Sequence, residues 1–263
     1  MPSERTSERL FFGALALIFA VSAAGTIVWC ASMSEMGGMP MPGGWTMSMT
    51  WMRMPGQTWP GAVASFLAMW VVMMLAMMLP SLIPALWRYR QAVGRTGGMR
   101  LAELAALVGV GYFLVWTALG LAAYPFGVGV ASVEMRIPAL ARAVPIAVGM
   151  VVLIAGAFQF TAWKAHHLAC CRKMPGSDLA LPAHAATAWR YGLRLGLHCS
   201  QCCAGLMATL LVIGIMDLRA MLAVTVAMTI ERLAPGGKRA AQAIGVAGLG
   251  TGFLLIMRAA GLG

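Results

Sequence analysis

Seven long apolar segments constrain this chain more than any other feature of its sequence. A helix that crosses a bilayer needs about 20 mostly apolar residues. Segments of this kind lie at residues 10–30, 62–82, 101–123, 139–163, 197–216, 219–230 with flanks, and 240–257. Only 10% of the residues are charged and 60% are hydrophobic, whereas a soluble domain has about 25% charged residues. The sequence therefore predicts an all-α, polytopic membrane helix bundle with about seven transmembrane helices.

Two of these segments leave alternatives open. The sixth is short and follows the fifth after Met216-Asp217-Leu218-Arg219, which a tight helical hairpin explains; six spans plus an interfacial helix is the alternative. The first is longer than the roughly 7–15 apolar residues of a secretory signal, so we interpret it as an uncleaved helix. The longest polar stretches have about 30 residues, too few to fold alone. Residues 1–263 are therefore predicted to form a single membrane domain.

The basic residues predict the orientation of the chain. Fourteen of the 19 Lys and Arg residues lie in the N-terminal segment and in the second, fourth and sixth connections, and five lie in the alternate segments. Because positively charged segments stay in the cytoplasm, the N-terminus is predicted inside and the C-terminus outside. The loop at 32–61 then faces the outside and the segment at 164–203 the cytoplasm. The net charge of +11 thus reflects membrane topology, and no nucleic acid partner is predicted.

The outer loop at 32–61 is rich in methionine, glycine and proline. Its glycines and prolines exclude a long regular helix, and thioether sulfur is a soft donor that suits Cu(I). The alternative is that the loop lies on the membrane surface or packs on the helical bundle, with methionine as adaptable filler. The candidate metal ligands in this loop are Met39, Met41, Met47, Met49, Met52 and Met54.

The second apolar segment continues this pattern. Met69, Met73 and Met77 are spaced i, i+4 and i+8 and share one helical face. Pro80 and Pro84 are predicted to end or bend this helix. Such a stripe more often serves packing than metal binding, and its position directly after the methionine-rich loop raises a path for a metal ion to an equal alternative.

Two cysteine and histidine clusters lie at the predicted cytoplasmic side. The first holds His166, His167, Cys170 and Cys171, and the second holds His198, Cys199, Cys202 and Cys203. In helices, His166/Cys170 and His167/Cys171 are i, i+4 pairs, Cys199 can meet Cys202 or Cys203, and His198 can meet Cys202. Thiolate and imidazole together suit Cu(I), with Zn(II) or another soft metal as the alternative.

The remaining candidate polar residues receive structural roles. Cys30 and His184 stand alone and are expected to be structural. Glu103, Asp217 and Glu231 lie near the ends of predicted spans, where solvated or helix-capping roles are expected. Lys164, Arg172 and Lys173 flank the first cysteine cluster and would favour thiolate over thiol.

Four segments together resemble the predicted metal-binding integral membrane protein family that includes the copper chaperone of a bacterial polyphenol oxidase. They are residues 39–59, 66–81, 192–218 and 231–235. Where the family has a Gly-Cys-Cys-aromatic run, this chain has Gln201-Cys202-Cys203-Ala204. The resemblance covers the chain from about residue 33 to 255 and implies a multi-pass protein of the bacterial inner membrane that handles copper.

The leading hypothesis is a non-enzymatic copper carrier or metallochaperone that binds Cu(I) and supplies it to a cuproenzyme. The predicted partners are the lipid bilayer, the copper ion and that copper-dependent enzyme. One alternative is a membrane thiol–disulfide oxidoreductase using Cys170/Cys171 or Cys199/Cys202, although no thioredoxin-like βαβ pattern surrounds either pair. The other alternative is a structural subunit of a membrane complex.

Overall fold

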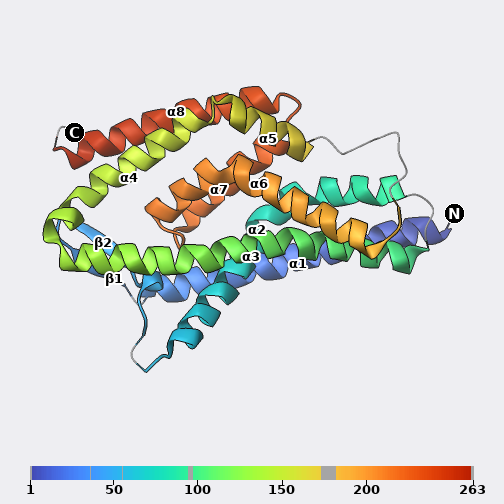
Figure 1. The fold of residues 1–263 in the computed structure, drawn as a ribbon, viewed down its shortest axis with the longest axis horizontal. Coiled ribbons are helices and arrows are strands. Elements are labelled where there is room, and N and C mark those ends of the chain that lie inside the picture. The colour runs from blue at the N-terminus through green and yellow to red at the C-terminus, as the bar shows by residue number, and fades with distance from the viewer. Residues whose placement is uncertain (1, 36, 55, 94–96, 173–181, 262–263) are drawn as a thin grey trace.

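The computed structural model describes residues 2–35, 37–54, 56–93, 97–172 and 182–261, and these ranges are overwhelmingly helical (Figure 1). The predicted all-α bundle is confirmed. Arg95 and Lys173, which contribute to the predicted orientation, lie outside the described residues. The elements in chain order are α1 (Pro2–Glu35), β1 (Gly38–Met41), β2 (Trp45–Ser48), η1 (Met49–Trp51), α2 (Trp59–Val93), α3 (Gly98–Arg136), α4 (Pro138–Phe158), α5 (Ala162–Arg172), α6 (Ala185–Ile213), α7 (Leu218–Leu233) and α8 (Gly237–Ala259).

Six of the described helices are long and apolar enough to cross a membrane, namely α1, α2, α3, α4, α6 and α8. The segment predicted as a sixth span forms α7, which has only 16 residues and measures about 24 Å at about 1.5 Å per residue. It is shorter than the bilayer core of about 30 Å. A connection of four residues separates α6 from α7, and the two chain termini lie at opposite ends of the long axis in Figure 1.

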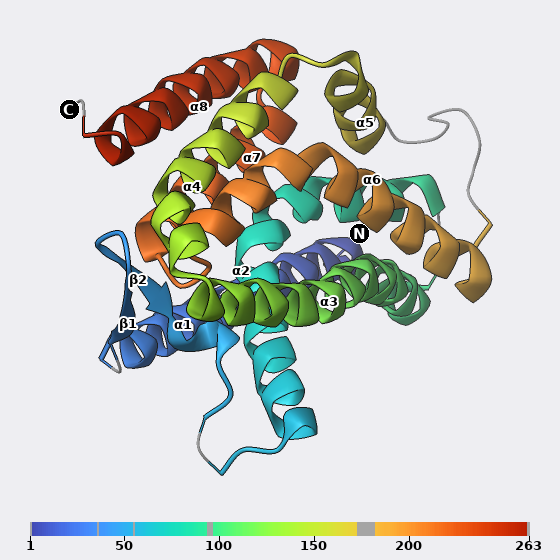
Figure 2. The same cartoon turned by 60° about the vertical axis from the view of Figure 1, so that its left-hand side comes forward.

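Several helix boundaries differ from the predicted ones. The predicted fourth span at 139–163 is interrupted after Phe158, and a separate helix, α5, begins at Ala162. α6 begins twelve residues before the predicted 197. α2 runs through Pro80 and Pro84 to Val93, so these prolines do not end it; instead the helix bends along its length (Figure 2). Membrane helices tolerate proline because neighbouring groups satisfy the freed backbone carbonyls.

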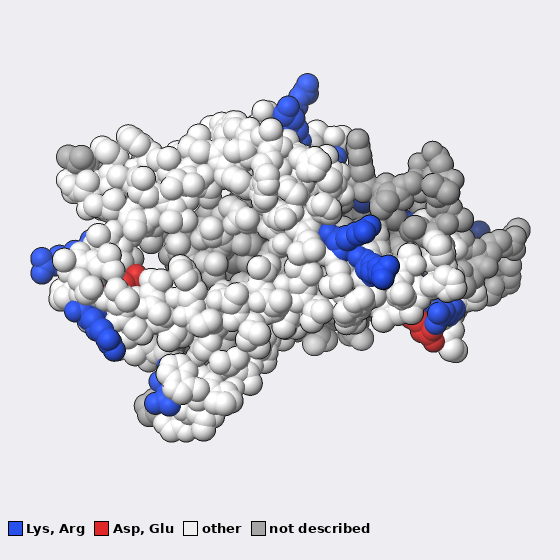
Figure 3. All heavy atoms as spheres, viewed as in Figure 1, with Lys and Arg blue, Asp and Glu red and all other residues white. Residues whose placement is uncertain are grey.

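The surface matches a bundle surrounded by lipid. Large apolar side chains are exposed on α1, α3, α7 and α8, for example Leu17, Leu114, Leu222 and Phe253. On the face shown in Figure 3, the charged side chains lie at the left end, at the upper edge and in the right half, and the area between the left end and the middle is uncharged. Six apolar helices with such a surface are compatible with a multi-pass membrane protein.

Glycine allows close helix contacts that fix the bundle. A Cβ atom on Gly156 of α4 would lie 2.6 Å from the backbone nitrogen of Leu249 on α8. Likewise, a Cβ atom on Gly111 of α3 would lie 2.9 Å from the carbonyl oxygen of Trp189 on α6. Small residues at such crossings let membrane helices approach until their backbones touch. The α3–α6 contact holds the cysteine-bearing helix α6 in place.

The methionine-rich segment forms a β-hairpin instead of a helix. Strands β1 and β2 are antiparallel, with Met39 opposite Met47, and Gly43 and Gly44 turn the chain with positive φ. Met41 and Met47 are buried against Ala131 of α3 and Ala141 of α4. The hairpin therefore packs on the helical bundle, and these two methionines fill that contact.

Candidate metal centre

Four cysteines from two helices lie together inside the bundle. Cys171 comes from α5, and Cys199, Cys202 and Cys203 come from α6; all four are buried. The sulfur of Cys202 lies 3.6 Å from that of Cys171 and 3.6 Å from that of Cys203. The sulfur of Cys199 lies 2.8 Å from the hydroxyl of Tyr112 on α3. We call these four residues the cysteine cluster.

A guanidinium group faces the cysteine cluster. Nη2 of Arg232, near the end of α7, lies 3.8, 3.5 and 3.6 Å from the sulfurs of Cys171, Cys202 and Cys203. Its Nη1 donates to the hydroxyl of Ser81 on α2 at 3.0 Å. Among the described residues Arg232 forms no ion pair with a carboxylate. The thiols are thus the groups placed to compensate its charge.

A buried ion pair supports the cluster from the other side. Nζ of Lys164 lies 2.7 Å from a carboxylate oxygen of Glu231, and both side chains are 1% exposed. Lys164 also donates to the carbonyl oxygen of Cys202. The expected capping role of Asp217 is confirmed, since its carboxylate accepts from two N–H groups of α7, and Glu103 is in an exposed pair with Arg100. The expected solvated or capping role of Glu231 is wrong, because its carboxylate is buried and paired with Lys164.

His166, His167 and His198 contact one another or Cys170. Nδ1 of His167 lies 3.2 Å from Nδ1 of His198, so the two predicted motifs also meet here. The expected pair His166/Cys170 is present, with its nitrogen 3.7 Å from the sulfur at an exposed position. Within the cysteine cluster Cys171 contacts Cys202, because α5 turns that sulfur toward α6. His184 is exposed at the start of α6.

Two groups on α5 have shifted pKa values. A hydrogen bond to Cys202, together with burial, raises the pKa of the Cys171 thiol. Burial lowers the pKa of His167, and the neighbouring His198 and His166 lower it further. Neutral imidazole is the form that binds a metal, so the environment of His167 favours its ligand form.

The methionines divide into a buried set and a surface set. Met69, Met73 and Met77 of α2 are buried in the core together with Met74 and Met78. This helix face leads to Ser81, one turn beyond Met77, whose hydroxyl contacts Arg232. The buried methionines of α2 therefore end beside the cysteine cluster. In the hairpin segment Met41 and Met47 are buried, whereas Met39, Met49, Met52 and Met54 are partly exposed.

The cluster offers soft donors, although its present arrangement is not that of a bound metal. Within the described ranges no group of three or more His, Cys, Asp or Glu side chains is arranged to hold a metal ion. The thiols of the cluster face Arg232 instead. Metal–sulfur bonds are about 2.3 Å long for zinc. If three sulfurs lie in one plane around a metal at this bond length, the sulfurs are about 4 Å from one another. The sulfur separations of 3.6 Å are close to that spacing.

Comparison with known proteins gives the family. The family model PpoB2, described as a copper chaperone, matches residues 67–255. The chain belongs to this family. The matched region holds the buried methionines of α2, the cysteine cluster and Arg232, whereas the methionine-rich hairpin and Cys30 precede it. No curated protein and no solved structure matched the chain.

Two functional candidates were missed by the sequence reasoning. Arg232 and Tyr112 gain their meaning only from the packing of α7 and α3 around α6. A signal was available for the first, because Arg232 belongs to the short segment 231–235 that carries part of the family resemblance. Nothing local in the sequence singles out Tyr112.

Proposed function

We propose that this protein binds Cu(I) at the cysteine cluster and passes it to a copper-dependent enzyme. The observation that carries the proposal is the approach of Cys171 from α5 to Cys202 and Cys203 from α6 around Arg232. Membership of a copper chaperone family supports copper as the cargo. Thiolate sulfur is the protein donor that best suits Cu(I).

Charge balance explains the role of Arg232 in this proposal. A Cu(I) ion held by two thiolates has a net charge of −1, and a buried charge is costly unless a partner compensates it. The guanidinium of Arg232 supplies the compensating positive charge at the sulfur atoms themselves. Before the ion arrives, the same group holds the thiols together.

The buried methionines of α2 complete the proposed pathway. Thioethers bind Cu(I) weakly enough to exchange it, and transfer requires sites that release as well as bind. Met69, Met73 and Met77 would pass the ion along α2 toward Ser81 and Arg232. The partly exposed methionines of the hairpin segment would capture or release it at the other end. The expected location is the bacterial inner membrane, with the N-terminus in the cytoplasm.

Thiol–disulfide exchange with a protein substrate at Cys199/Cys202 is disfavoured by burial. A partner thiolate must reach the sulfur that it attacks, and Cys199, Cys202 and Cys203 are at most 1% exposed. The same burial suits an ion that must be kept from water.

The test is a Cu(I) titration of the full-length protein in detergent under reducing conditions, against a chromophoric Cu(I) chelator. We expect Cys202→Ser to weaken binding at least about tenfold, since even residues that only orient ligands cost about 10–100-fold in affinity. Cys170→Ser is the matched control, because this partly exposed thiol lies outside the cluster. Equal affinity of Cys202→Ser and wild type would overturn the proposal. Repeating the titration with Zn(II) tests the alternative cargo.

A further inference from the structure

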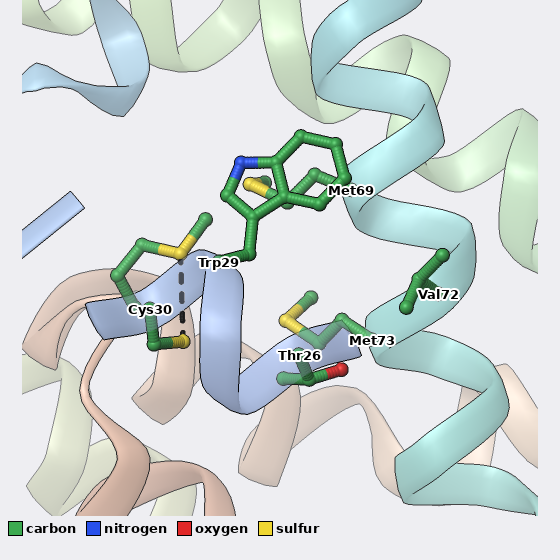
Figure 4. Close-up of a pocket in the computed structure, with 7 residues that line it drawn as sticks. Thr26, Trp29, Cys30, Met69, Val72 and Met73 are labelled. Atoms are coloured by element: carbon green, nitrogen blue, oxygen red, sulfur yellow. Dashed lines mark hydrogen bonds between the residues drawn. The ribbon is translucent and has the colours of Figure 1, made fainter. Parts of the chain in front are cut away.

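A second group of sulfur atoms surrounds a small cavity at the other end of the bundle. The cavity has a volume of about 10 Å³ and is lined by Thr26, Trp29, Cys30, Met69, Val72, Met73 and Met216 (Figure 4). These residues come from α1, from α2 and from the connection between α6 and α7. In Figure 4 the side chains of Met69 and Met73 extend from α2 toward α1, which carries Trp29 and Cys30.

The sulfurs of Met216 and Met221 lie close to that of Cys30. The thiol of Cys30 donates to the thioether of Met216 at 3.7 Å and lies 4.0 Å from that of Met221 on α7. Three sulfurs at bonds of about 2.3 Å from one metal would lie about 4 Å apart in a plane. Cys30 is 2% exposed, and Met69, Met73 and Met221 are also buried. Cys30 stands alone in the sequence, whereas in space Met216 and Met221 contact it.

We propose that Cys30, Met216 and Met221, together with Met69 and Met73, form a second Cu(I) site. The cavity is near the smallest size that holds one water molecule, so it suits a single ion without its hydration shell. Its lining supplies soft sulfur donors, which favour Cu(I) over hard cations. The indole of Trp29 adds a ring face that attracts a cation.

Binding at this site needs no redox step. The Cys30 thiol releases its proton to solvent and forms a sulfur–copper bond, so that copper stays monovalent and the thiolate and ion are neutral together. A neutral complex suits a buried position, where an isolated charge is costly. One thiolate among several thioethers makes the site weaker than one built from two thiolates, as expected for a site that loads the path.

The position of this site gives it a role within the proposed function, on which this inference rests. Met69 lies twelve residues before Ser81 on α2, or about 18 Å along the helix at about 1.5 Å per residue. Ser81 contacts Arg232 at the cysteine cluster. We place the Cys30 site as the first buried site that the ion reaches. The methionines of α2 lead from this site to the cysteine cluster.

The experiment counts Cu(I) equivalents bound by the full-length protein in detergent, measured against the chromophoric chelator. We expect Cys30→Ser to lose one equivalent relative to wild type, and Cys170→Ser to lose none. Met216→Leu should weaken the affinity for that one Cu(I) ion about tenfold. Met150→Leu, which replaces an exposed methionine of α4, should leave that affinity unchanged. An unchanged number and affinity of bound ions in both Cys30→Ser and Met216→Leu would overturn the site.

A second background separates this inference from the proposed function. In Cys171→Ser/Cys202→Ser, the remaining Cu(I) should show only sulfur neighbours by X-ray absorption and should disappear when Cys30→Ser is added. If Cys30→Ser loses one Cu(I) ion but Cys202→Ser alone does not weaken binding, the proposed function fails and the Cys30 site stands. If Cys202→Ser weakens binding but Cys30→Ser loses no ion, the Cys30 site fails. A melting temperature equal to wild type shows that each variant is folded.

Discussion

At the scale of single residues, Arg232 decides the chemistry of the cysteine cluster. It is the last but one residue of α7, and its guanidinium contacts three thiols and the hydroxyl of Ser81 at once. Arginine presents several donors in a rigid planar fork, whereas lysine offers a single compact charge. The side chain therefore both compensates charge and fixes the spacing of the sulfurs, and a lysine would do only the first.

We expect Arg232→Leu to weaken Cu(I) binding by about 10–100-fold and Arg232→Lys to recover only part of that loss. The reason is that leucine removes the compensating charge and, unlike methionine, adds no sulfur donor. The measurement is the chelator competition described above, and X-ray absorption should still report sulfur neighbours. Arg194→Leu, which removes an exposed arginine on α6, should leave the affinity unchanged. Wild-type affinity in Arg232→Leu would show that the guanidinium only packs.

At the scale of helices, packing through glycine sets where the functional side chains lie. α4 and α8 meet at Gly156, where an added Cβ would strike the backbone of residues 248 and 249. Backbone cannot move aside as a flexible side chain can, so a larger residue must separate the two helices. Because α5 follows α4 after only three residues, a displaced α4 also shifts Cys171.

We expect Gly156→Leu to destabilise the protein by about 1–3 kcal/mol, the usual cost of overpacking a filled site. Gly250→Leu on α8 is the matched control, because a Cβ there meets nothing within 4 Å. Thermal unfolding in detergent, followed by circular dichroism, compares the two variants with wild type. Equal melting temperatures for both variants would contradict a tight α4–α8 contact.

At the scale of the whole molecule, the short helix α7 determines that the two ends of the chain lie at opposite ends of the bundle. The two termini lie at opposite ends of the long axis (Figure 1), although only six described helices have the length of a span. α7 reverses the direction of α6 and brings Met221 toward one end and Arg232 toward the other. α7 therefore adds, to the six described helices of span length, a further pass that is too short to meet both membrane surfaces.

We expect the termini to lie on opposite sides of the membrane, with the N-terminus in the cytoplasm. Green fluorescent protein should fluoresce when fused to the N-terminus, and alkaline phosphatase should be active when fused to the C-terminus. Exchanging the two reporters should silence both. Fluorescence of green fluorescent protein at both termini would instead place the two termini in the cytoplasm and make α7 an interfacial helix.

The sequence alone determined the fold class, because segments of about 20 apolar residues have no other stable state in lipid than a helix. It also identified Cys171, Cys202 and Cys203 as soft donors, since their residue types and spacing are local properties. Only the tertiary structure decided which donors meet. It paired His167 with His198, buried Met41 and Met47 in a packing contact, and brought Arg232, Cys30 and Met216 to their sulfur partners. These contacts join residues far apart in the chain, and helix crossings fix them through side-chain shape, which local periodicity does not encode.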